Sequence, residues 1–186
     1  MRHFEALHNV PPYDYNLPDP DLSPLGYEQA NPAIEMVEKI PSIDLIVCSP
    51  LIRTLQTYSL VFHNRMNIPL IIHPDLQEKC DGPCDTGSPL IDLYKKFPNL
   101  SNELKTFEET FGNSGWCDKI NPDSLYSSKQ IKQRIKCFHQ WLMNRPEEHI
   151  FIISHNLILK EFFIDAHQPL KTDIRNGEIK TISYNC

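Results

Sequence analysis

The sequence predicts an α/β sandwich built on a mostly parallel sheet, and three observations support this prediction. Runs of consecutive apolar residues recur at 44–49, 70–72 and 149–154, as is typical of strands buried on both faces. Segments with helical spacing of apolar residues separate these runs. With 186 residues, 40% of them hydrophobic, the chain can bury a core as a single domain, residues 1–186.

The first helix is expected over residues 24–40, after a surface loop at 10–24 that is rich in Pro, Asp and Tyr. Ser23 fits an N-cap, and Pro24 suits the first helical position. Pro32 is expected to kink or interrupt this helix, because its ring displaces a backbone hydrogen bond. The expected buried stripe consists of Leu25, Ala33, Met36 and Val37.

The elements in the middle of the chain follow from the first two apolar runs. The strand at 44–49 leads into a helix that starts at Pro50 and continues through Val61, and 70–72 forms the second strand. Residues 74–127 are turn-rich, with two helices expected at 90–97 and 101–111.

The C-terminal part repeats the alternation of helix and strand. Helical spacing of apolar residues predicts a helix over 128–144. The most apolar run, 149–154, predicts a strand that passes directly into a helix at 157–164. Gly177 is expected to turn the chain into a last strand at 179–184.

Charge and composition exclude several classes of function. The net charge of −6 and the pI near 5.7 argue against a general nucleic-acid binder or a protein of anionic membrane surfaces. The sequence has no apolar stretch long enough to span a membrane, and no hydrophobic signal segment follows Met1. Six scattered cysteines favour reduced thiols and a cytoplasmic or nuclear protein.

Polar side chains follow the predicted strands where ligands bind in such sheets. His3, Ser49 and His155 are all expected at the carboxyl edge of the sheet. Arg53 lies one turn into the next helix, and Glu78 follows the second strand. Taken singly, each has an ordinary interpretation: a solvated terminus, a turn histidine, a surface arginine or a solvated carboxylate.

Together these residues indicate phosphoryl transfer through a phosphohistidine. His3 is the expected nucleophile, and Arg2 and Asn9 would hold an anion against it. The planar fork of Arg53 suits paired phosphate oxygens. His155, expected to be protonated, would add positive charge beside a helix N-terminus, and Glu78 would supply a proton. His8 is expected to face the substrate or to support the nucleophile.

The sequence resembles the histidine phosphatases, also called phosphoglycerate-mutase-like proteins. Five motifs occur in that family's order: Arg2-His3 with His8-Asn9, residues 22–30, residues 49–57, Leu76-Gln77-Glu78 and Ser154-His155. The opening R-H-x4-H-N, with Leu-Gln-Glu and Asp85-Thr86-Gly87, is similar to a fungal branch of small phosphatases. The resemblance implies a three-layer α/β/α fold and no metal or organic cofactor. It also implies that His3 is the nucleophile and Glu78 the general acid, with Arg2, Asn9, Arg53 and His155 binding the phosphoryl group.

Three positions depart from the family pattern. Phe4 stands where the family usually has glycine, so we expect a differently shaped phosphate loop. Asn156 also replaces a usual glycine, but asparagine tolerates left-handed backbone. Only Met1 precedes the Arg-His pair, where the family has its central strand. A truncated first strand is therefore expected, with unpaired backbone groups beside it.

The expected function is that of a phosphomonoester phosphatase acting on a small phosphorylated substrate, either a metabolite or a phosphopeptide. The alternative is a catalytically inactive or weak relative that serves as a binding or scaffold subunit. A metal site formed by His3, His8, Cys80 and Cys84 has irregular ligand spacing and is disfavoured. A mutase is less expected than a phosphatase, because the chain shows no extra elements to shield a phosphoenzyme from water. Residues 80–123 are the expected lid and specificity insertion.

Overall fold

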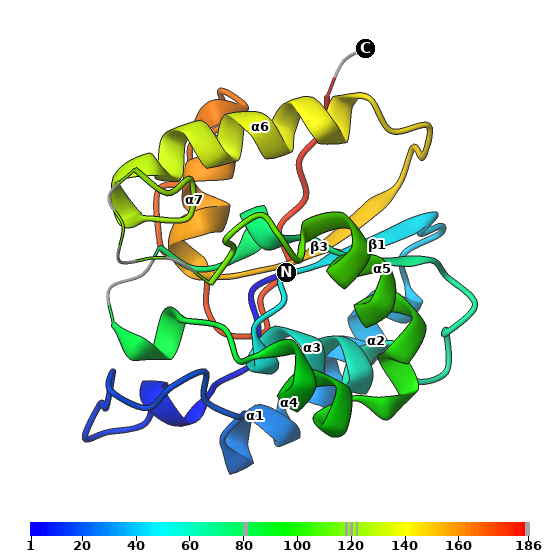
Figure 1. Cartoon of the computed structure of the whole chain (residues 1–186). Helices are drawn as coiled ribbons and strands as arrows, with labels where there is room; N and C mark the ends of the chain where they lie inside the picture. Colours follow the sequence, from blue (N-terminus) through cyan, green and yellow to red (C-terminus); the bar gives the residue numbers. More distant parts are fainter. Residues whose placement is uncertain (80–81, 118, 120, 122, 185–186) are drawn as a thin grey trace.

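A parallel sheet of three strands lies at the centre of the protein. The computed structural model describes residues 1–79, 82–117, 119, 121 and 123–184. Its strands are β1 (Leu45–Cys48), β2 (Leu70–Ile72) and β3 (Ile150–Ile153), in the order β2-β1-β3 (Figure 1). The three apolar runs of the sequence are therefore the three strands, and all their pairings are parallel, as predicted.

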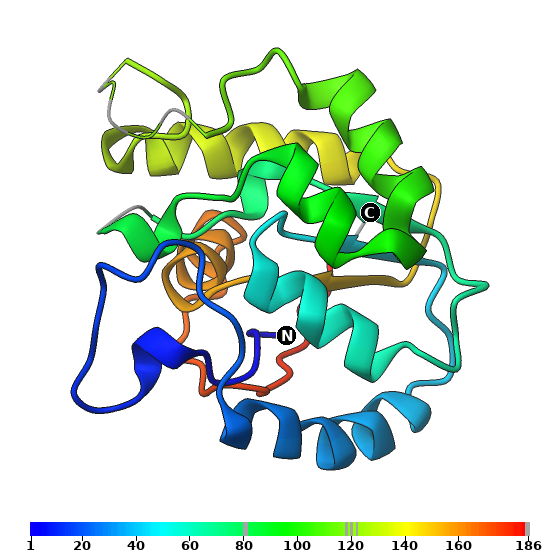
Figure 2. The ribbon, with the colours of Figure 1, turned by 60° about the horizontal axis from the view of Figure 1, so that its bottom comes forward.

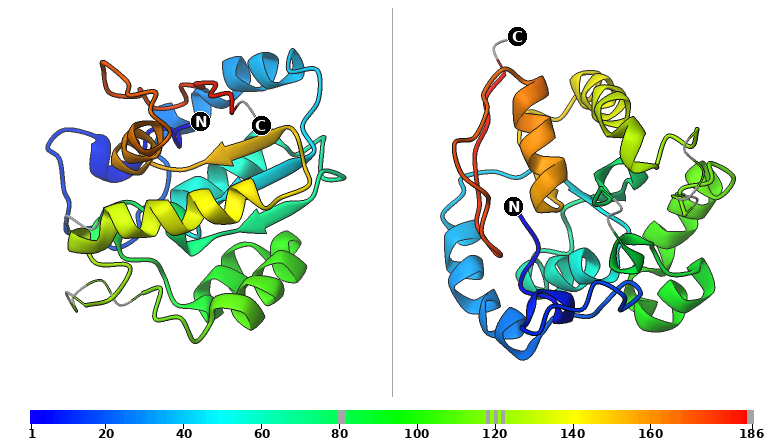
Figure 3. Two further views of the ribbon diagram at one scale, coloured as in Figure 1. Left: turned by 90° about the horizontal axis from the view of Figure 1, so that it is seen from above. Right: turned by 90° about the vertical axis from the view of Figure 1, so that its left-hand side faces the viewer.

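Each face of the sheet is covered by a layer of helices, which confirms the α/β/α sandwich (Figure 3). Ile46 and Cys48 of β1 point into a core shared with α2 (Ala30–Glu38), α3 (Ile52–Val61), α4 (Leu90–Lys96) and α5 (Ser101–Phe111). The alternate residues Leu45 and Val47 point into a second core with α6 (Ile131–Met143) and α7 (Asn156–Asp165). This alternation explains why the strands read as unbroken apolar runs.

The helix expected over 24–40 is two helices, α1 (Pro24–Glu28) and α2, which is a correction. The break falls at Gln29, so Pro32 lies in the first turn of α2, where no intrahelical N–H bond is lost. The expected stripe is correct for Ala33 and Val37 and wrong for Leu25 and Met36, which are 48% and 44% exposed. Leu25 belongs to a separate short helix and therefore does not continue the stripe of α2.

The C-terminal segment 179–184 is not a strand, contrary to the prediction. The open edge of β3 is approached instead by the N-terminal residues. Met1 donates its terminal N–H to the Ile152 carbonyl at 2.7 Å and accepts from the Ser154 N–H at 3.0 Å. Arg2 and Ser154 form an isolated parallel bridge where the expected first strand would enter the sheet. A cleft of about 700 Å³ follows the rest of this edge, between β3 and residues 179–184.

The remaining helices match the sequence with small shifts at their ends. Helix α6 begins at Ile131, after a short 3-10 turn at Ser128–Gln130, and Gly177 turns the chain with a φ of +75°. Helices α4 and α5, within the expected insertion 80–123, pack into the core through Leu93 and Phe107. Part of that insertion is thus a layer of the sandwich. Within the described residues, no helix is long and apolar enough to cross a membrane.

Candidate active site

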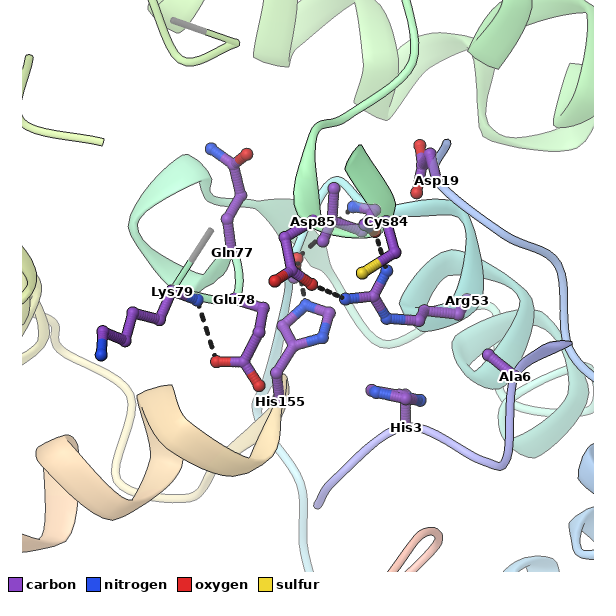
Figure 4. Close-up of polar contacts among 12 residues, drawn as sticks. His3, Ala6, Asp19, Arg53, Gln77, Glu78, Lys79, Cys84, Asp85 and His155 are labelled. Carbon is purple, nitrogen blue, oxygen red and sulfur yellow. Dashed lines mark hydrogen bonds and ion pairs between the residues drawn. The ribbon is translucent and has the colours of Figure 1, made fainter. Parts of the chain in front are cut away.

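Two histidines meet at the carboxyl edge of the sheet, as the sequence predicted. His155 follows β3, and the His3 N–H bonds to the Ser154 carbonyl at 2.9 Å, which brings the N-terminal segment alongside. The ring centroids of His3 and His155 are 5.1 Å apart (Figure 4). Both side chains are almost fully buried, at 2% and 0% exposure. The end of β3 and the N-terminal segment bonded to it therefore bring both imidazoles to one place.

The His3 imidazole is held in the form that a nucleophile requires. Its Nδ1 lies 2.5 Å from the Phe4 carbonyl oxygen, an acceptor, so we assign the proton to Nδ1 and the lone pair to Nε2. Burial lowers the pKa of His3 well below its ordinary value, and the neighbouring Arg53 and Arg2 lower it further. The ring is accordingly neutral at pH 7.

His155 has a different bonding pattern. Its Nε2 lies 2.9 Å from the Ser49 hydroxyl, at the end of β1, while its Nδ1 is buried without a hydrogen-bond partner. Burial, followed by the charge of Arg53, lowers the pKa of His155 well below its ordinary value. In these surroundings the imidazole is neutral at pH 7. The protonated His155 that was expected beside a bound phosphoryl group stays a prediction.

Arg53 enters the site from the first turn of α3 and is 1% exposed. It donates to the Cys84 carbonyl at 2.7 Å and forms an ion pair with Asp85 at 2.9 Å (Figure 4). Its Nε remains buried without a partner. Arg2 is arranged similarly, with one terminal nitrogen donating to the Ile174 carbonyl at 2.8 Å and its Nε unpartnered.

Four side-chain nitrogens of this region are thus buried without a partner. They are Arg2 Nε, His8 Nδ1, Arg53 Nε and His155 Nδ1. Burying a polar group unpaired costs roughly 1–3 kcal/mol, so a cluster of such atoms calls for a ligand. Two of them belong to guanidinium groups, whose N–H groups can only donate, and this suits an anion.

His8 joins the cluster, which the sequence left open. Its ring centroid is 6.2 Å from that of His3, and the side chain is 6% exposed. Burial, with the charge of Arg53 adding to it, lowers the pKa of His8 to about 4. His8 therefore lies beside His3 as a neutral ring.

The Glu78 side chain reaches the first turn of α7, the helix that follows His155. Its two carboxylate oxygens accept from the N–H groups of Lys79 at 2.9 Å and Leu157 at 3.3 Å. Burial raises the pKa of Glu78, and the neighbouring charge of Asp85 raises it further. Both effects favour the protonated acid that the sequence-based role requires.

The loop that carries Glu78 is fixed from several sides, by residues for which the sequence analysis gave no role. Gln77 donates to the carbonyls of Pro74 and Trp116 at 3.0 and 3.1 Å, and Arg134 donates to the Gln77 carbonyl at 2.8 Å. The Ser154 hydroxyl donates to the Leu76 carbonyl at 2.7 Å. Apart from the contact between Gln77 and Pro74, these contacts join parts of the chain far apart in sequence, so no local pattern signals them.

The contact that the structure gives the Asn9 side chain lies within its own turn. Its oxygen accepts from the Ala6 N–H at 3.2 Å and closes the 3-10 helix Leu7–Asn9. The phosphate-binding role of Asn9 therefore stays a prediction.

Phe4 does not enter the phosphate region, although it replaces a glycine of the family pattern. Its ring is fully buried in the core, and its N–H donates to the Thr57 hydroxyl at 3.1 Å. Gly177 makes room for it, because a Cβ there would lie 3.1 Å from the ring. Asn156 accepts from the Ile174 N–H at 3.0 Å and opens α7 in right-handed helical backbone.

A metal centre finds no support among the described residues, which contain no group of three or more metal-ligating side chains. Burial raises the pKa of the Cys84 thiol to about 12, whereas a metal ligand is a thiolate. Cys80, the fourth residue of that hypothesis, lies outside the described residues.

Comparison with known proteins agrees with this geometry. The sequence model of the histidine phosphatase superfamily (branch 1) matches residues 1–186. A probable phosphatase of Schizosaccharomyces pombe is 26% identical, over 87% of this chain and 74% of its own. Phosphoglycerate mutase-like protein 1 of Arabidopsis thaliana is 26% identical, over 98% and 78%.

Solved structures show the same fold. The alpha-ribazole phosphatase of Shigella flexneri superposes with a TM-score of 0.63 at 24% identity, over 95% of this chain and 85% of its own. A phosphoserine phosphatase of Entamoeba histolytica superposes with a TM-score of 0.57 at 19% identity, over 95% and 84%. The fold and site thus define the class of the protein, a phosphatase among the hydrolases. The chain belongs to the histidine phosphatase superfamily.

Proposed function

We propose that this protein hydrolyses phosphomonoesters through a phosphohistidine formed on His3. The observation that supports this most is the set of four buried, unpartnered nitrogens around two facing imidazoles. A phosphoryl group has enough oxygens to accept from all of them. A neutral imidazole at the centre of such a cluster is suited to attack phosphorus.

In the first step, the Nε2 lone pair of His3 attacks phosphorus while the bond from phosphorus to the leaving oxygen breaks. Arg2 and Arg53 stabilise the charge on the equatorial oxygens. The bound dianion raises the pKa of His155, so that this ring can then donate a charged hydrogen bond. Glu78 transfers its proton to the leaving oxygen, which departs as an alcohol.

The second step releases the phosphoryl group. Water attacks phosphorus and loses a proton to the Glu78 carboxylate, while the bond between phosphorus and His3 breaks. Inorganic phosphate leaves, and His3 and Glu78 return to their starting states. The same carboxyl group thus serves as acid and then as base, which its partly buried position permits.

We propose a small phosphorylated substrate, either a metabolite or a phosphopeptide. The structural neighbours named for phosphoserine and glucosyl-3-phosphoglycerate support the small-molecule choice by likeness of fold.

A second candidate function, binding without turnover, is favoured by one contact. The Asp85 carboxylate is paired with Arg53, so an incoming phosphate meets a like charge near the guanidinium. If that pair persists with a ligand bound, the protein would hold phosphorylated partners weakly and transfer nothing.

The test is hydrolysis of an aryl phosphate by wild type, His3→Ala and a control, His63→Ala, which alters an exposed histidine at the end of α3. We expect His3→Ala to lose turnover and His63→Ala to keep it. Undiminished turnover by His3→Ala would end the phosphohistidine proposal. A wild type that binds phosphoesters and never turns them over would establish the second candidate.

A further inference from the structure

A line of four aromatic rings leads from the nucleophile to the protein surface. Ring centroids are separated by 6.2 Å from His3 to His8, 6.3 Å from His8 to Tyr15, and 6.5 Å from Tyr15 to Tyr13. The two histidines are buried, whereas Tyr15 and Tyr13 are 54% and 61% exposed. The tyrosine rings are nearly parallel, with an interplanar angle of 13°.

The loop that carries the tyrosines is attached to the same segments as the phosphate site. The Tyr15 carbonyl accepts from the Cys84 N–H at 3.1 Å, and the Cys84 carbonyl binds Arg53. Further along, Asp19 is buried and accepts from the Ile52 N–H of α3 at 2.9 Å and from the Ser88 N–H at 2.8 Å. Figure 2 shows this loop alongside the segment near residue 84. The position of the rings is thereby tied to that of Arg53.

We propose that Tyr13 and Tyr15 form a stacking subsite for a planar ring of the substrate, set several bonds from the phosphate as in a nucleoside 5′-monophosphate. The inference rests on the proposed function of the His3 site and specifies its substrate class. With phosphorus at His3, a ring bonded directly to the ester oxygen would lie near His8. A ring carried on a sugar reaches further, to Tyr15.

The chemistry of the loop fits a base and disfavours a second phosphate. Residues 4–38 contain no Lys or Arg, and of the acidic residues of the loop Asp19 is buried, Asp21 is paired with Lys96 at 2.6 Å, and Asp14 is exposed. A diphosphate or triphosphate tail would therefore meet like charge along this side. Stacking of a neutral base on tyrosine needs no countercharge, and the exposed Leu7 and Val10 extend the apolar surface.

The test compares adenosine 5′-monophosphate with ribose 5-phosphate. Both release the same kind of primary alcohol, so their chemical steps are matched and the base is the main difference. We expect kcat/KM for the nucleotide to exceed that for the sugar phosphate by on the order of tenfold or more, the value of one stacked base.

Three variants assign that preference to the tyrosines. Y13L/Y15L should bring the ratio of the two kcat/KM values close to one, because leucine has no ring face. Y13F/Y15F should keep the ratio, since only the hydroxyls are removed. Tyr27→Leu, a change at an exposed tyrosine on α1, is the control and should also keep it.

The outcomes separate this inference from the phosphatase itself. Turnover of both substrates with a ratio near one in wild type, or with a ratio that Y13L/Y15L leaves unchanged, overturns the stacking subsite and leaves the phosphatase standing. A preference for phosphotyrosine over both the nucleotide and the sugar phosphate would place the substrate's aromatic ring at His8, and this result would also overturn the stacking subsite. If neither substrate is turned over, calorimetric binding of the two decides: equal affinities overturn the subsite, and tighter nucleotide binding that Y13L/Y15L abolishes supports it.

Discussion

Asp85 affects two groups of the site at once. It holds one terminal nitrogen of Arg53 at 2.9 Å, and its charge adds to the burial that raises the pKa of Glu78. The pair orients the guanidinium so that Nε stays unpartnered, and the same negative charge favours the protonated form of the proposed acid. A single carboxylate thus links Arg53 to Glu78, the proposed proton donor.

Replacing Asp85 by Asn should shift the pH dependence of turnover. Glu78 must be protonated to act as acid, so kcat falls as pH rises through its pKa. Removing the Asp85 charge lowers that pKa, and the alkaline limb of the kcat profile should move to lower pH. The exposed carboxylate of Asp92 provides the control, Asp92→Asn, which should leave the limb in place. An unmoved limb in Asp85→Asn would show that the two carboxyls are not coupled.

Replacing Glu78 by Gln removes the proton donor without removing the binding nitrogens. We expect turnover of an alkyl phosphate to fall roughly 10²–10⁴-fold, the usual contribution of a general acid. An aryl phosphate with a good leaving group needs less protonation and should lose less in the first step. Equal losses for both, measured by single-turnover kinetics, would contradict the assignment of Glu78 as the acid.

The sequence predicted which side chains gather at this site better than it predicted the contacts between them. His155 was found because an apolar run marks the strand that ends before it, whereas His3 was found from the polar opening of the chain and its resemblance to a family motif. Asp85 was seen as part of a motif but given no role, since its partner Arg53 lies 32 positions away in the chain. The protonation of His155 depends on a bound anion, because burial and the charge of Arg53 lower its pKa in the protein alone, and no sequence pattern shows that balance.

At the scale of elements, Gly177 connects the end of the chain to the start. Its φ of +75° favours glycine, and the Phe4 ring lies where a Cβ would point. The Gly177 N–H also donates to the Arg2 and His3 carbonyls, both at 3.2 Å. The turn therefore supports the segment that carries His3.

Changing Gly177 to Ala should destabilise the protein by roughly 1–3 kcal/mol, the range for a strained left-handed position. Part of this cost should come from Phe4. In a Phe4→Leu background the same change should therefore cost less, which a double-mutant cycle of denaturant unfolding would measure. A cycle without coupling would mean that the backbone conformation alone, and not the ring, requires glycine.

The strands were predictable because alternate residues of each are buried in different cores. The failures have physical causes as well. The Gln29 break depends on tertiary packing, where Gly26 allows a close approach to the Glu5 carbonyl. Residues 179–184 do not form the expected strand. Residues 1–3 instead occupy part of the open edge of β3, and only tertiary structure decides which segment lies there.

For the whole molecule, several buried basic groups make stability sensitive to acid. Burial lowers the pKa of the Met1 amine to about 5, of His8 to about 4 and of His73 to about 3. Each binds a proton more readily when unfolded, so stability falls as pH decreases below its unfolded pKa. Burial raises the pKa of Asp75 to about 6, so this group has the opposite effect: its contribution to the stability of the protein is lost as pH rises.

His73 should account for a measurable part of this dependence. Its ring packs against Phe111, Phe138 and Trp141, and its Nδ1 accepts from the Asp75 N–H at 3.2 Å. His73→Asn keeps an acceptor but cannot titrate. Between about pH 4 and 6, the slope of unfolding free energy against pH should decrease by about 1.4 kcal/mol per unit, one proton. An unchanged slope in urea unfolding series would contradict the assignment.

The fold brings the first residues of the chain and a strand end 150 positions later around one proposed phosphoryl site. The most direct test is to mix the protein with a phosphomonoester, quench within milliseconds in alkali, where phosphohistidine survives, and locate the phosphoryl group by peptide mass spectrometry. We predict one acid-labile phosphoryl group on the peptide containing His3, absent from His3→Ala. A phosphoryl group on a different residue, or continued hydrolysis without any phosphoenzyme, would contradict the account.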